Sequence, residues 1–75
     1  MSLHEFLDAV PDGFETHLDE DKGYLVVTLT RDTHLSVNRS GHATEVESPR
    51  NFVVYDFGFI EPDELPEVLE AAVEG

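Results

Sequence analysis

Apolar residues recur at the spacing of one helical face near each end of the chain. They stand at Leu3, Phe6, Leu7 and Val10 near the amino end, and at Leu65, Val68, Leu69 and Ala72 near the carboxyl end. Both sets follow the i, i+3, i+4, i+7 repeat of an amphipathic helix. Ser2 and Glu5 have the spacing of a capping box, which predicts the start of the first helix. Asp63 is the expected N-cap of the second, because Pro66 then falls in its first turn.

Between these helices, apolar and polar residues alternate with the period of a β-strand. The expected strands are residues 14–20, 24–31, 34–39, 42–47 and 51–60, and turn signals separate them. The second strand is apolar on both faces near Val26 and Val27. We therefore expect it to lie centrally and to be covered, at least in part, on both sides.

The third and fourth strands are expected to form a hairpin around residues 40–41, with a loop of two or four residues. Because side chains alternate with period two, one face would hold Leu35, Val37, Thr44 and Val46. The other face would hold His34, Ser36, Ala43, Glu45 and Glu47. His34 and His42 would then point to opposite faces, and a contact of His34 with Glu45 or Glu47 would be an ordinary cross-strand pair.

The pattern predicts one small α+β domain over residues 1–75, an antiparallel meander sheet of four to five strands packed with an N-terminal and a C-terminal helix. Two layers with both helices on one sheet face are the economical arrangement. One helix on each face is the alternative, favoured by the two-sided strand 24–31. Area scaling gives about 4,600 Å² of folded surface and burial of roughly 62% of the unfolded surface, so the core is small.

Charge separates this chain from ordinary acidic proteins. It has 17 acidic and 4 basic side chains in 75 residues, a net charge of −13, with Lys22 as its single lysine. The composition, which also favours Val far above Ile, resembles that of proteins from haloarchaea that accumulate salt. Such a surface opposes compaction at low ionic strength, where the Debye length is about 8 Å at 0.15 M against about 3 Å at 1 M. We expect compact structure in strong salt and loosening in dilute buffer. The other interpretation of the acidity is a surface that binds a basic partner or mimics DNA.

Several classes of site lack their motifs. There is no cysteine, which excludes a disulfide scaffold and a cysteine-based zinc site. The histidines His4, His17, His34 and His42 lack the usual ligand spacing, so neither a metal site nor a cofactor is expected. No nucleophile elbow and no glycine-rich phosphate loop is present. No apolar run has the length of a secretory signal or a membrane span, so we expect a cytoplasmic protein.

Asp56 is the acidic residue with the most unusual context, because it interrupts an apolar strand. The functional interpretation is a partly buried carboxyl group with a raised pKa that acts as a general acid or base. The alternatives are an ion pair with Arg31, Arg39 or Arg50, or a charge that prevents edge-to-edge aggregation. Gly58, two residues later, indicates a bulge or a close backbone approach.

The same strand is expected to carry Val53, Tyr55, Phe57 and Phe59 in one row. Aromatic rows can stack nucleic-acid bases, but such binders also need a positive groove, and only three arginines are present. Packing against the C-terminal helix is the simplest alternative. A dimer surface is the other, since a small domain gains much from burying an apolar patch.

These features favour a small, salt-adapted protein-interaction or regulatory module without catalysis, which binds a protein partner or itself as a homodimer. The expected interaction residues are Tyr55, Asp56, Phe57 and Phe59. The alternative is a small ligand-binding protein or enzyme with a site around Asp56, His34 and Arg50. Neither nucleic acid nor a membrane is expected as a partner.

Overall fold

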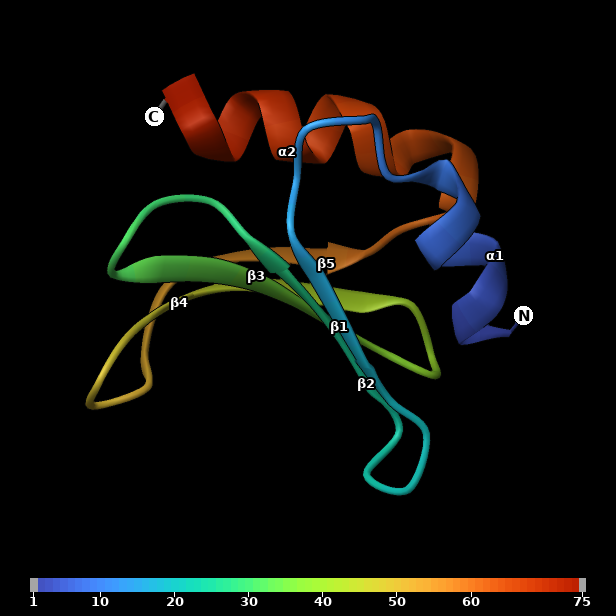
Figure 1. Cartoon of the computed structure of the whole chain (residues 1–75), viewed down its shortest axis with the longest axis horizontal. Coiled ribbons are helices and arrows are strands. Elements are labelled where there is room, and N and C mark those ends of the chain that lie inside the picture. Colours follow the sequence, from blue (N-terminus) through green and yellow to red (C-terminus); the bar gives the residue numbers. More distant parts are fainter. Residues whose placement is uncertain (1, 75) are drawn as a thin grey trace.

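A computed structural model of the chain describes residues 2–74 (Figure 1). The elements are α1 Leu3–Ala9, β1 Thr16–Asp19, β2 Tyr24–Thr28, β3 Thr33–Asn38, β4 His42–Glu47, β5 Phe52–Phe59, the 3-10 turn η1 Pro62–Glu64, and α2 Leu65–Glu74. The predicted order of two helices flanking five strands is confirmed. No helix among these residues is long and apolar enough to cross a membrane.

The five strands form one sheet in the order β1-β2-β3-β4-β5. Every neighbouring pair is antiparallel, so the predicted meander is confirmed. This order makes β1 and β5 the two edges of the sheet, each with one free side.

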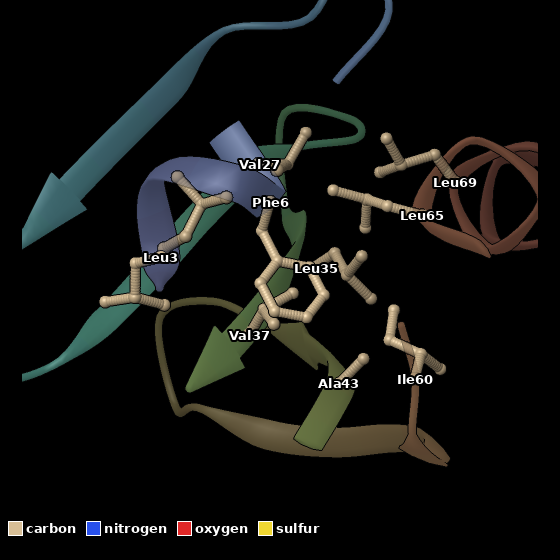
Figure 2. Close-up of a cluster of buried hydrophobic side chains, with 10 residues drawn as sticks. Leu3, Phe6, Val27, Leu35, Val37, Ala43, Ile60, Leu65 and Leu69 are labelled. Atoms are coloured by element: carbon tan, nitrogen blue, oxygen red, sulfur yellow. The ribbon is translucent and has the colours of Figure 1, made fainter. Parts of the chain in front are cut away.

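Both helices cover the same face of the sheet. In the core, Leu3 and Phe6 of α1 and Leu65 and Leu69 of α2 pack against one face of the sheet. The strand residues on this face are Leu25, Val27, Leu35, Val37 and Ala43. Figure 2 shows Phe6 among Leu35 and Val37, with the leucines of α2 beside them. The two-layer arrangement is therefore confirmed, and the alternative with one helix on each face is wrong. Val26, which suggested that alternative, is half-buried on the face away from the helices.

The helix starts differ from the predicted caps. Ser2 is the N-cap of α1, but its side chain makes no capping hydrogen bond; the Glu5 N–H donates to the Ser2 backbone oxygen. The C-terminal helix begins earlier than Asp63, with Glu61 before η1. There the Glu61 N–H donates to Glu64 Oε1 over 2.8 Å. The acidic side chain at the third position thus satisfies a backbone donor that the helix leaves free.

The β3–β4 hairpin has a loop of odd length, and this changes which side chains share a face. Val37 is paired with Ala43. Between them Asn38 Oδ1 accepts the N–H groups of Ser40 and His42, while Gly41 takes the left-handed conformation with φ 88°. Glycine suits that conformation because it has no Cβ to clash. The predicted even loop is wrong.

The consequence is a one-residue slip that exchanges the faces of β4. Ala43 and Glu45 lie on the helix-covered face, while Thr44 and Val46 lie on the open face, which is the sheet face away from α1 and α2. His34 is paired with Val46 on this open face, so the expected contact with Glu45 or Glu47 does not form. By the same alternation His42 shares the face of His34, contrary to the prediction.

Candidate interaction surface

Strand β5 is an apolar edge strand, and in the part of the chain that the structure describes its only neighbour in the sheet is β4. Its large apolar residues with more than half of their surface exposed are Phe52, Val53, Val54, Tyr55 and Phe59, of which Phe59 is the most exposed at 73%. Among residues 2–74 only one other large apolar side chain, Val73 of α2, is as open. Edge strands with exposed apolar side chains and free backbone groups are ready templates for pairing with another chain.

Two bulges interrupt β5. Asp56 is paired with Thr44 and Gly58 with Ala43, which leaves Phe57 between them without a partner. A second register shift leaves Val54 unpaired in the same way. Gly58 has φ 75°, so the bulge that this glycine predicted is present. Each extra residue shifts the alternation of side chains by one position.

The bulges split the expected aromatic row, which is therefore wrong as a single row. Phe57 packs against the core, and Tyr55 contacts it edge to face with ring centroids 4.8 Å apart. Phe59 lies on the open face, where its ring stacks on His42 at 5.0 Å. The exposed aromatic side chains thus flank both sides of the β5 edge, and a partner strand at this edge would contact both groups.

Asp56 is exposed and its carboxylate is held as an anion. Its Oδ1 accepts the Gly58 N–H over 2.8 Å and lies 2.7 Å from His42 Nε2. The hydrogen bond from Gly58, followed by that from His42, lowers the pKa of Asp56 below its ordinary value. The expectation of a raised pKa is wrong, because the carboxylate is neither buried nor short of donors. Its ionic partner is His42 and not an arginine.

The structure does not join the residues of the alternative site. Asp56 contacts His42, whereas His34 is paired with Val46 and Arg50 lies exposed in the loop between β4 and β5. His42 is the residue that the sequence interpretation missed. The signal was the Asn38 and Gly41 pair, which is compatible with a three-residue loop ending in a left-handed glycine. Within residues 2–74 no three His, Asp or Glu side chains gather as a metal site would require.

Charge is divided sharply along the chain. Residues 22–60 carry four acidic and four basic side chains and are neutral, whereas residues 1–21 carry seven acids and residues 61–75 six, with no base in either. The neutral segment makes strands β2 to β5, while the acidic segments make β1 and both helices. All of the net charge therefore lies on β1 and on the helix layer, which is α1, η1 and α2. The β5 edge lies in the neutral segment, residues 22–60.

The open face of the three central strands is free of carboxylates. The side chains that share this face by strand pairing and alternation are Tyr24, Val26, Thr28, His34, Ser36, Asn38, His42, Thr44 and Val46. In a chain with 17 acids, this face offers neutral polar and apolar groups, which suit contact with another molecule better than a carboxylate surface does.

The contacts of Asp56 predict a pH dependence. The pKa of Asp56 is lower in the folded chain than in the unfolded chain, where it is about 3.9. Ionised Asp56 therefore stabilises the fold at pH values above about 3.9, and this stabilisation is lost as the pH falls through the pKa of the folded chain. An NMR titration of the carboxyl carbon should give a midpoint below about 3.9, and Asp56→Asn should cost stability near pH 6 but not at the acid end. Asp12→Asn, in the exposed loop after α1, is the control. A midpoint at or above the ordinary value contradicts the assigned contacts.

Comparison of the chain with protein-family models, with curated proteins and with solved structures found no match. The functional proposal below therefore rests on the geometry and charge of the chain itself.

Proposed function

We propose that this chain is a small protein-interaction module without catalysis, and that it associates with a second copy of itself through β5. The observation that carries the proposal is the free edge of β5, where five large apolar side chains are more than half exposed. A partner β5 would satisfy the free backbone groups of the edge and cover these side chains at the same time.

The exposed apolar area of β5 is comparable with the area that a stable protein interface buries. Phe52 and Tyr55 are each 58% exposed and Phe59 is 73% exposed. At about 200 Å² for each aromatic side chain, they present roughly 380 Å² to solvent. An ordinary stable interface buries about 800 Å² on each partner. The three rings alone supply nearly half of that, and the two valines and the strand backbone add to it.

The distribution of charge favours a second copy at this edge. Two chains of net charge −13 repel each other, and the repulsion is weakest where their neutral segments meet. β5 lies in the neutral segment and contains one carboxylate, Asp56, which is already paired with His42. Antiparallel pairing of two β5 strands about a two-fold axis gives a closed, isologous contact.

Light scattering tests this proposal directly. In about 2 M KCl, where repulsion is screened, the molar mass should rise from one chain of 8.4 kDa toward two chains as the concentration increases. A mass that stays at one chain up to about 1 mM contradicts self-association, because an interface of this kind should hold at that concentration.

The module is further proposed to be adapted to concentrated salt in a cytoplasm. Acid neighbours such as Asp19, Glu20 and Asp21 repel one another in dilute buffer and are screened in brine. The free energy of unfolding should therefore rise between about 0.15 M and about 2 M KCl, as measured by urea denaturation. Equal stability in both solutions would remove the salt adaptation and leave the carboxylates without that explanation.

A further inference from the structure

A trough of about 600 Å³ lies on the open face of the sheet. Figure 1 shows α1 and α2 on the other side of the sheet. Val26 and Val46 are its apolar residues, on β2 and β4. The turn before β2 and Asn51 of the loop before β5 also line it. No residue of β5 lines the trough, so it is separate from the edge proposed for self-association.

The polar side chains of the trough can all donate hydrogen bonds, and the formal charge among them at neutral pH is the positive charge of Lys22. Lys22 supplies the only lysine ammonium of the chain. Asn38 has its Oδ1 committed to the hairpin turn, where it accepts from Ser40 and His42, so its NH₂ group is the part left for a ligand. Among residues 2–74 no carboxylate lines the trough, although acids make up 17 of the 75 residues.

Three further polar side chains in the trough are half-buried: Tyr24, His34 and Ser36. The hydrogen bonds within residues 2–74 engage none of these three side chains. Partly desolvated polar groups gain most from a partner that also excludes water. An apolar surface bordered by several free polar groups is the usual composition of a small-molecule site.

We propose that the trough binds a small planar organic molecule that carries a carboxylate or amide group. Its acceptor oxygens would meet the donors of Lys22, Tyr24 and Asn38, and its apolar ring would lie against Val26 and Val46. A cationic ligand would find no carboxylate among the described residues of the trough, and the Lys22 ammonium would repel it. This site is independent of the proposed dimer and adds a ligand to the module.

Three probes of similar shape and different charge test the proposal. Benzoate, benzamide and benzylamine are titrated into the full chain in about 1 M KCl, where the general repulsion of anions is screened, and amide NMR shifts are followed. Benzoate and benzamide should shift the amides of residues 24, 36 and 38 saturably, with dissociation constants on the order of 1–10 mM. Equal shifts with benzylamine, or no shifts at these residues, would overturn the proposal.

A pair of variants separates local binding from overall charge. Ser36→Glu places a carboxylate in the trough and should weaken benzoate binding about fivefold or more. Val73→Glu adds the same charge on α2, which covers the opposite face of the sheet, and should leave binding nearly unchanged. Equal weakening by both variants would mean that no local site exists.

A Val54→Asp chain tests whether the two sites are independent. It is altered only at the β5 edge and should bind benzoate as the unchanged chain does, whatever its oligomeric state. Loss of benzoate binding in this variant would overturn the independence of the two sites.

Discussion

A chain carrying Val54→Asp is expected to stay monomeric where the unchanged chain dimerises, with the dissociation constant raised about 100-fold or more. Val54 is the unpaired bulge residue near the middle of β5 and is 52% exposed. Replacing it by aspartate would forfeit the transfer free energy that the two half-exposed valines gain in the contact, together about 1.5–3 kcal/mol. It would also bring two carboxylates together across the two-fold axis, and charged side chains on an edge strand oppose pairing. Light scattering in strong salt measures the effect.

Val73→Asp is the matched control for this prediction. Val73 is exposed by the same 52% but lies on α2, near Pro11 and Phe14 of the segment that precedes β1. It should leave the dissociation constant within about threefold of the unchanged value, because the added charge lies outside the proposed contact. If Val73→Asp separates the copies and Val54→Asp does not, the helix layer is the contact and the assignment to β5 is wrong.

Phe6→Ala is expected to lower the free energy of unfolding by about 3–5 kcal/mol. Phe6 is fully buried between α1 and the sheet, so the truncation leaves a cavity at the centre of a small core. The total stability of a domain of 75 residues is of the order of 4–11 kcal/mol. The variant should therefore be largely unfolded in dilute buffer and measurable in about 2 M KCl by urea denaturation.

The same substitution at an exposed phenylalanine supplies the comparison. Phe52 is 58% exposed on β5, and Phe52→Ala should cost about 0.5 kcal/mol or less when measured at concentrations where the chain is monomeric. If Phe6→Ala fails to fold, Phe6→Leu replaces it. Leucine keeps most of the side-chain volume, so the loss in the free energy of unfolding should lie between those expected for Phe6→Ala and Phe52→Ala. Similar losses for Phe6→Ala and Phe52→Ala would contradict the placement of the core.

The order of elements and the meander follow from patterns that the sequence shows openly, and the packing of both helices on one face is the simpler of the two arrangements that it allows. A helical repeat at Leu3 and Phe6, and another at Leu65 and Leu69, each gives one apolar stripe. Two stripes and one continuous apolar sheet face are most simply buried together. These features depend on averages over many residues, so they tolerate local irregularity.

The candidate surface was harder to predict because it depends on single-residue shifts. One extra residue in the loop around Gly41 moved His42 onto the open face, and one bulge at Phe57 brought Asp56 within 2.7 Å of it. Neither shift changes the hydrophobic pattern much, yet each reverses which side chains meet. Residues Tyr55, Asp56, Phe57 and Phe59 were singled out from the sequence, but their split between two faces required the strand register.

The distribution of charge over the surface also depends on the topology. A net charge of −13 suggests a surface that is acidic everywhere, whereas residues 22–60 are neutral. The charges of each segment can be counted from the sequence. Which surface is acidic depends on the topology, which places the acidic ends of the chain on β1 and the helix layer. The proposed interaction edge and the proposed ligand trough both lie in this neutral part.

Amide hydrogen exchange at two protein concentrations tests the β5 contact most directly. The sheet has two free edges, β1 and β5, so each chain contains its own reference. In about 2 M KCl, raising the concentration from about 10 μM to about 1 mM should slow exchange of amides in β5 and leave those of β1 unchanged. Exchange in β5 that is the same at both concentrations, or a slowing confined to β1 or α2, would contradict the account.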